Sequence, residues 1–201
     1  MYRLVSMNEK KVKGQKLRKN NRRFRVGDLA VYPAHGVGKI EAIESKVING
    51  EKHDFYIMKV IENNMVIMIP TSNVDSVGLR DVINEKEIAE VYNVMKKKKE
   101  PPNDNQTWNR RYREYMEKIK TGSLYDVAEV FRDLFLLKST KDLSFGERKL
   151  YDTAQDLLVG ELSTAKKTDE KTIISEIELL FTPSNLPQKV RDFADEQVVL
   201  T

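Results

Sequence analysis

The spacing of apolar residues changes near residue 84, and this change divides the chain into two regions of different secondary structure. Between residues 24 and 82, apolar residues form short runs that end at turn-forming residues, as Met65–Ile69 does before Pro70. Asn49-Gly50 lies between two such runs, and both residues tolerate the positive φ of a tight hairpin turn. From Asn84 onward the apolar residues recur every three or four positions, which is typical of amphipathic helices.

The region 24–82 is predicted to contain four or five short strands with no helix between them. A unit this small favours a strongly bent β-barrel of the SH3 or Tudor kind over a sandwich. We expect one open edge, whose unpaired backbone groups can accept a strand from a partner. In the run Met65–Ile69 the residues of both faces are apolar. The face that does not line the core must therefore be covered, either by the helical region or by a partner.

Five helices are predicted between residues 83 and 181, and capping patterns locate where most of them begin. The start signals are Asn84 with Glu87, Ser123 with Asp126, Ser144 with Glu147, and Thr168 or Asp169. Pro101-Pro102 separates the first helix from the second, and Pro183 ends the fifth. The predicted fold class is α+β with two domains, a small Tudor/SH3-like β-barrel followed by a five-helix bundle.

The second predicted helix begins with the only tryptophan of the chain, Trp108, and carries three arginines. Its apolar residues have the spacing of one helical face: Trp108, Tyr112, Tyr115, Met116 and Ile119. Arg110 and Arg113 lie off this face, and Arg111 lies on its flank. On pattern alone Trp108 is a core residue, because core stripes are much commoner than exposed aromatic wedges. The alternative is a nucleic-acid contact, in which guanidinium groups hold phosphates while the indole inserts at a base step.

Basic charge is concentrated in two segments, although the net charge of the whole chain is only +4. Residues 1–23 hold nine Lys or Arg and one acid, which leaves 26 basic and 30 acidic residues for the rest. Residues 1–23 also lack apolar periodicity, so we expect a disordered basic tail, and we expect a loose tail at 182–201. Within the acidic remainder, residues 96–120 form a patch of nine basic and four acidic residues. A nucleic-acid contact by the folded part must rest on this patch.

The residue types that most catalytic and metal sites require are scarce. The chain has no cysteine, and His35 and His53 are its only histidines, too few for a catalytic triad or a metal centre. No motif of a phosphate-binding loop, a metalloprotease or a serine hydrolase occurs. We therefore expect no enzyme activity, no catalytic residue, no metal and no cofactor. The lack of a signal-type or membrane-spanning apolar run predicts a cytoplasmic protein without membrane contact.

Motifs in both regions are weak one by one but specific in their order. In the strand region they are Phe24-Arg25-Val26-Gly27-Asp28, Val31-Tyr32-Pro33, His35-Gly36-Val37-Gly38 and Ile40-Glu41-Ala42-Ile43. The later ones are Gly78–Val82, Trp108-Asn109-Arg110-Arg111-Tyr112, Leu143-Ser144-x-Gly146-Glu147 and Leu158–Leu162. Together they cover Phe24–Phe181 and resemble the CarD/CdnL family of bacterial transcription regulators. The polymerase-interacting module of this family also occurs in the transcription-repair coupling factor.

The resemblance implies that residues 24–82 form a Tudor-like domain that binds the β subunit of bacterial RNA polymerase by edge-strand pairing. The residues here that would make the contact are Lys46, Ile48, Val66 and Met68. The family often has a basic residue where this chain has Met68, so we expect an apolar or weaker contact at that position.

The resemblance also implies that the helical domain, residues 83–181, contacts promoter DNA at the upstream edge of the transcription bubble. Trp108 would then be a minor-groove wedge that disfavours bubble collapse, which reverses the expectation of a core residue. The basic residues in DNA contact would be Arg110, Arg111, Arg113 and Arg148. The implied protein is a monomeric, nucleoid-associated regulator that stabilises the promoter open complex.

Two other classes of function remain open from the sequence. One is a DNA-binding protein that acts without polymerase, although the acidic body of the chain argues against it. The other is an adaptor that bridges polymerase to another protein, with Trp108 in the core.

Overall fold

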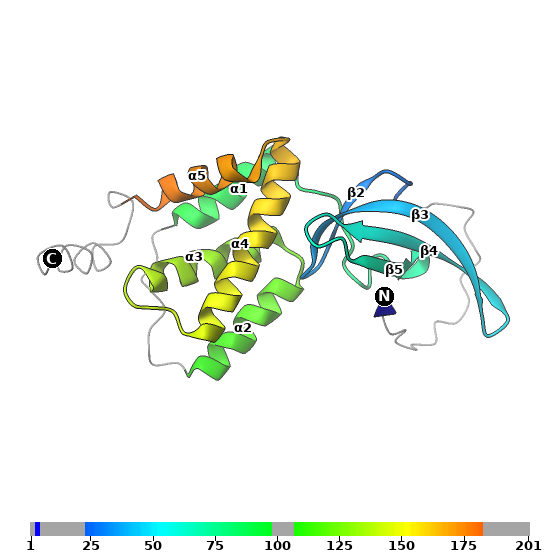
Figure 1. Ribbon diagram of the computed structural model, residues 1–201, viewed down its shortest axis with the longest axis horizontal. Helices are drawn as coiled ribbons and strands as arrows, with labels where there is room; N and C mark the ends of the chain where they lie inside the picture. Colours follow the sequence, from blue (N-terminus) through cyan, green and yellow to red (C-terminus); the bar gives the residue numbers. More distant parts are fainter. Residues whose placement is uncertain (1–2, 5–22, 98–106, 183–201) are drawn as a thin grey trace, which may run out of the picture. The chain divides into compact units, whose positions relative to one another are not determined.

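The computed structural model describes residues 3–4, 23–97 and 107–182, and it divides into two compact units (Figure 1). One unit comprises Met1–Tyr32 and Val37–Asp81 and holds the described strands. The other comprises Pro33–Gly36 and Val82–Thr201 and holds the described α-helices. The predictions of a disordered tail and a loose tail fall, for residues 5–22 and 183–201, outside the described residues.

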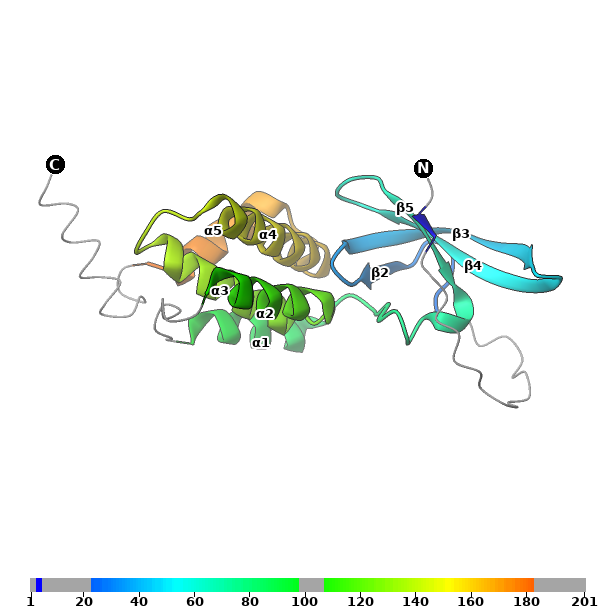
Figure 2. The ribbon, with the colours of Figure 1, turned by 90° about the horizontal axis from the view of Figure 1, so that it is seen from below.

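The first unit is a curled half-barrel built from four antiparallel strands, which confirms the predicted strand region. The elements are β2 (Leu29–Tyr32), β3 (Gly36–Ile48), β4 (Glu51–Val60), β5 (Val66–Pro70) and a 3-10 turn, η1 (Thr71–Asn73). Between β3 and β4, Asn49 and Gly50 have φ of 53° and 82°. Both residues are therefore left-handed, as the hairpin prediction requires. Figure 2 shows the β3–β4 hairpin extending away from the rest of its sheet.

A short strand, β1 (Arg3–Leu4), occupies the outer edge of β5. It pairs in parallel, with Arg3 opposite Ile67 and Leu4 opposite Met68. Two residues of the predicted disordered tail, Arg3 and Leu4, therefore pair with the sheet. The physical reason is that an edge strand presents unpaired N–H and C=O groups that a segment of the same chain can satisfy.

The sheet of the first unit has apolar residues on both of its faces. The inner face carries the main core of this unit, which includes Ile40, Tyr56, Met58, Ile67 and Ile69. The outer face carries a second buried cluster of Phe55, Ile57 and Met68, with Ala42, Ile48 and Val66 packed against it. Strand alternation separates the two sets, since Met68 lies opposite Ile57 while its neighbour Ile67 lies opposite Met58.

The second unit contains the five predicted helices. They are α1 (Glu85–Lys96), α2 (Trp108–Lys120), α3 (Leu124–Lys138), α4 (Phe145–Lys166) and α5 (Glu170–Leu180). α3 packs against α1, α2 and α4, and α5 packs against α4 (Figures 1 and 2). The core forms around Phe131, whose ring stacks on Tyr151 with centroids 5.2 Å apart.

The helix starts agree with the capping patterns in the sequence. Asn84 with Glu87 and Ser144 with Glu147 form reciprocal capping boxes, and Ser123 and Asp169 accept bonds from the first turns of α3 and α5. α2 is the exception, because its N-cap Thr107 makes no side-chain bond to the helix. The start of α2, where Trp108 lies, is therefore held by tertiary contacts rather than by a cap.

Candidate nucleic-acid interface

Trp108 is half-buried, with its indole between α2 and α4. Its ring lies 5.5 Å from that of Tyr112, centroid to centroid, and Tyr112 is 41% exposed. On the other side, a Cβ at Gly146 would lie 2.8 Å from Cζ2 of the indole. The absence of a side chain at Gly146 therefore lets the ring pack on the start of α4, while part of it stays at the surface.

A groove of about 520 Å³ runs between α2 and α4 beside the indole. Trp108, Tyr112 and Gly146 line it together with the polar residues Asn109 and Lys149. Its lining is thus largely apolar with a few polar side chains, a composition that suits a flat ring with polar edges.

Arg111 lies inside the unit, where it pairs with Glu147 from α4. Nη2 of Arg111 is 3.0 Å from Oε1 of Glu147, and the two side chains are only 7% and 5% exposed. This differs from the expectation that Arg111 holds a phosphate, because a DNA backbone does not reach a side chain buried to this degree. Arg111, on the flank of the apolar stripe, is buried because the carboxylate of Glu147 forms a buried ion pair with its guanidinium group.

The carboxylate of Glu147 accepts hydrogen bonds both from the N-cap of α4 and from Arg111 of α2. Its Oε2 accepts bonds from the backbone N–H of Ser144 at 2.9 Å and from the Ser144 hydroxyl at 2.8 Å, while Oε1 accepts from Arg111. Burial by itself raises the pKa of Glu147, but the bonds from Ser144 and the charges of Lys141 and Arg111 outweigh it and lower the pKa below its ordinary value. The carboxylate is therefore ionised, and it ties the cap of α4 to the first turn of α2.

The other expected DNA contacts are on the surface. Arg110, Arg113 and Arg148 are exposed, the first two on α2 and the third in the first turn of α4. Nε of Arg110 lies 3.1 Å from Oε1 of Glu114, an exposed pair that a phosphate can displace at little cost. These three cations lie on the two helices between which the indole packs.

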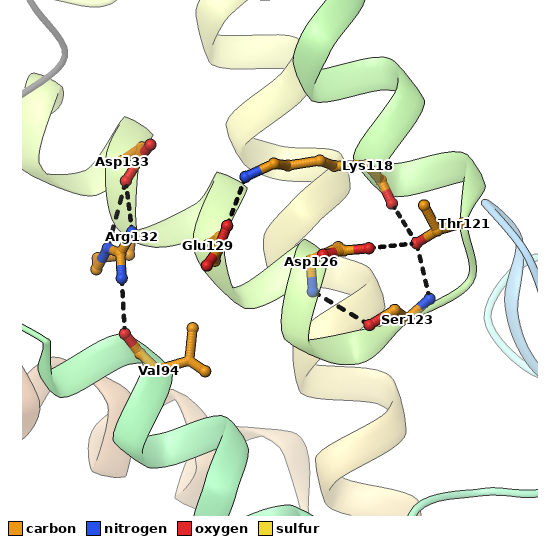
Figure 3. A network of polar contacts seen from close by, with 8 residues as sticks. All are labelled: Val94, Lys118, Thr121, Ser123, Asp126, Glu129, Arg132 and Asp133. Carbon is orange, nitrogen blue, oxygen red and sulfur yellow. Dashed lines mark hydrogen bonds and ion pairs between the residues drawn. The ribbon is translucent and has the colours of Figure 1, made fainter.

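Polar contacts fix the far end of α2 to α3, as Figure 3 shows. Lys118 donates to Glu129 at 2.5 Å, and the Thr121 hydroxyl lies 2.8 Å from Oδ2 of Asp126. Arg132 of α3 pairs with Asp133 and donates to the carbonyl of Val94 in α1 at 2.9 Å. The helix that carries Trp108 is thereby held at both ends, by Glu147 near its start and by this network near its end.

The four residues that were expected to bind polymerase lie on one face of the sheet, the outer one. Val66 and Ile48 are half-buried, Met68 is 7% exposed, and Lys46 is exposed, with Nζ 3.7 Å from Glu44. The backbone edge of β5, which carries Val66 and Met68, is the edge that β1 pairs with.

Sequence reasoning missed three positions at the start of α4. Glu147 was recognised only as part of a cap, Gly146 only as a motif residue, and Phe145, which is 87% exposed, not at all. Phe145 had a signal, because it falls outside the inward stripe of α4 although it is aromatic. Among the described residues, no cluster of His, Asp and Glu is suited to a metal, and no helix is long and apolar enough to cross a membrane.

Comparisons with known proteins agree across both units. The CarD-like/TRCF RID domain family matches residues 24–83, and the CarD C-terminal domain family matches residues 90–178. The putative transcription factor YdeB of Bacillus subtilis (strain 168) is 39% identical over 155 residues, which cover 76% of this chain and 98% of YdeB. The structure of CdnLNt from Myxococcus xanthus is 42% identical, covers 36% of this chain and 97% of its own, and has a TM-score of 0.27.

These matches define the class as a non-enzymatic transcription regulator that interacts with RNA polymerase. The chain belongs to the CarD/CdnL family.

Proposed function

We propose that the chain stabilises the promoter open complex, with the first unit bound to the β subunit of RNA polymerase and the second unit in contact with promoter DNA. The observation that carries the proposal is the half-buried indole of Trp108 between α2 and α4, the two helices that also carry the exposed Arg110, Arg113 and Arg148. A ring with one packed side and one surface side is suited to insertion at a base step, because it is both supported and accessible. The exposed cations beside it suit the phosphates that flank such a step.

On the polymerase side, the partner strand would add to the edge of β5. Val66 and Met68 would flank it on the apolar outer face, whereas Lys46 and Ile48 lie two strands away on β3 and would be reached only by a partner that also covers this face. Main-chain hydrogen bonds give the affinity in such strand addition, and the side chains of the face give the selectivity. Because β1 pairs with this edge, a partner strand must displace Arg3–Leu4 before it can bind there.

The two contacts act together through local concentration. Binding to polymerase holds the second unit near the promoter, so a weak DNA contact becomes effectively intramolecular. The open complex is stabilised only as far as the indole binds melted DNA better than closed DNA. Stacking of one aromatic side chain on a base is worth about 1–3 kcal/mol, which corresponds to a change of about five- to hundredfold in the lifetime of the open complex.

The test combines purified bacterial RNA polymerase, a linear promoter and two variants of Trp108. Trp108→Ala should leave polymerase affinity unchanged and shorten the lifetime of the open complex, whereas Trp108→Phe, which keeps an aromatic ring, should restore part of it. Leu179→Ala serves as the control, since Leu179 is an exposed apolar residue of α5. An unchanged lifetime with Trp108→Ala would favour an adaptor role, and DNA binding without polymerase affinity would favour a polymerase-independent protein.

A further inference from the structure

Phe145 is an aromatic side chain that lies almost wholly in solvent. It is 87% exposed, more than the other large apolar residues of the described chain, of which Val47 comes next at 72%. Phe145 is the first residue of α4, directly after the N-cap Ser144. The apolar residues that precede and follow it, Leu143 and Leu150, are both buried. The exposure of Phe145 therefore differs from that of the apolar residues nearest to it in the sequence.

Side-chain bonds hold the backbone at the helix start that carries Phe145. Glu147 accepts bonds from the N–H and the hydroxyl of Ser144, and the same carboxylate is anchored by the buried guanidinium of Arg111. An exposed ring on a fixed backbone loses less entropy on binding than a ring on a mobile loop.

Phe145 is also close to Trp108. Its neighbour Gly146 contacts the indole, since a Cβ at that glycine would be 2.8 Å from Cζ2. Consecutive Cα atoms are about 3.8 Å apart, so the Cα of Phe145 lies within about 8 Å of the indole. Bases of one strand rise by about 3.4 Å each, so two residues whose helix positions are this close can contact one stretch of a few nucleotides.

The charge around Phe145 favours a nucleic acid over a protein partner. Lys141, Arg148 and Lys149 are exposed basic residues of the same segment, against one exposed acid, Asp142, because Glu147 is taken up by the buried pair with Arg111. An aromatic ring among cations matches a base flanked by phosphates.

We propose that Phe145 is a second aromatic contact of the second unit, which stacks on an unpaired base of the strand whose neighbouring base step is contacted by Trp108. The inference rests on the proposed function, because it assumes that the Trp108 surface meets promoter DNA. It adds a second kind of DNA ligand to that surface, namely melted single-stranded DNA in addition to the duplex at the upstream edge of the bubble. The contact is independent of base identity, since every base has a flat face.

The experiment measures the affinity of the full-length chain for three targets at one salt concentration. The targets are purified bacterial RNA polymerase alone, its complex with a fully paired promoter fragment too short to open, and its complex with the same fragment carrying a mismatched bubble. The variants are Phe145→Ala, Phe145→Leu and Phe145→Tyr, with Trp108→Ala for comparison and Leu179→Ala as the exposed apolar control. Because Phe145 is 87% exposed, these variants should melt within a few degrees of the wild type.

Phe145→Ala and Phe145→Leu should lose about five- to hundredfold in affinity for the bubble complex only, and Phe145→Tyr should keep the wild-type affinity. Full affinity with Phe145→Leu would overturn the proposal, since an aliphatic chain of similar size cannot stack. Full affinity with Phe145→Ala, while Trp108→Ala weakens binding, would overturn it and leave the proposed function intact. Full affinity with both variants would remove the proposed function as well.

Discussion

Gly146 sets the position of the Trp108 indole, and the substitution Gly146→Ala, which adds one methyl group, tests this. In Gly146→Ala the new Cβ would lie 2.8 Å from Cζ2 of Trp108 and 3.3 Å from Cε2, where ordinary contacts begin at 3.4 Å. The ring or the backbone of α4 must therefore shift, by about 0.6 Å if the contact between Cβ and Cζ2 is to reach the ordinary 3.4 Å. Trp108 is half-buried at the uncapped start of α2, so it has room to move outward.

Two opposing effects decide the stability of Gly146→Ala. Alanine in place of glycine in a helix stabilises by about 0.5–1 kcal/mol. Relief of an overpacked contact costs about 1–3 kcal/mol when the neighbours are fixed, and less when one of them is free to move. We expect these to cancel to within about 1 kcal/mol of unfolding free energy, while the displaced indole shortens the lifetime of the promoter open complex. The open-complex lifetime of Gly146→Ala should thus fall while its unfolding free energy stays close to that of the wild type.

Gly160 provides a matched control in the same helix. A Cβ at Gly160 would meet nothing within 4 Å, so Gly160→Ala should gain the full helix-propensity term of about 0.5–1 kcal/mol and leave the open complex unchanged. The two variants are compared by chemical denaturation, by the emission of Trp108, and by open-complex lifetime with purified polymerase. If Gly146→Ala gained as much stability as Gly160→Ala and left the emission of Trp108 unchanged, the contact between Gly146 and the indole would be refuted.

Two further predictions concern the buried ion pair and the edge of the sheet. Glu147→Gln leaves Arg111 buried beside a neutral group, so it should cost about 3–5 kcal/mol near neutral pH by chemical denaturation. The pKa of Glu147 in the folded protein lies below the ordinary 4.5, so its ionised carboxylate contributes fully to stability above pH 4.5, and this contribution is lost as the pH falls through the folded pKa. The unfolding free energies of wild type and Glu147→Gln should therefore converge in acid. A difference that stays constant with pH would contradict the ion pair as the source of the stability. Leu4→Pro should weaken the pairing of β1, because proline has no backbone N–H and fits poorly in a sheet, and should tighten polymerase binding by about two- to tenfold, the equivalent of one net hydrogen bond of about 0.5–1.5 kcal/mol. Equal polymerase affinity for Leu4→Pro and wild type, measured by titration, would show that the partner does not add at the edge of β5.

The elements that could be predicted from the sequence are those whose causes are local. A capping box needs only two residues three positions apart, and the Asn49-Gly50 hairpin needs only two residues that accept a positive φ. These signals do not depend on what the element later packs against. For that reason the starts of α1, α3, α4 and α5 and the β3–β4 hairpin are confirmed.

The parts of the candidate site that could not be predicted depend on residues far apart in the sequence. Arg111 is on the flank of its own helix, and only the carboxylate of Glu147, 36 positions later, makes its burial favourable. The pairing of Arg3–Leu4 with β5 joins segments more than 60 positions apart and carries no sequence pattern. Periodicity places a side chain on a face of its own element, but it cannot say which partner that face will meet.

The ion pair between Arg111 and Glu147 explains why an apolar stripe alone would not be sufficient at this site. A buried pair of this kind is often no more stabilising than apolar residues of the same size, so stability does not account for its presence. What it adds is geometry, because the guanidinium must meet one particular carboxylate, and that carboxylate is fixed by the cap of α4. The pair therefore fixes the start of α2 against the start of α4 in one register, which a set of interchangeable apolar contacts would not do. The indole of Trp108 and the ring of Phe145 both lie at this junction, so the same carboxylate controls how the two aromatic side chains are presented.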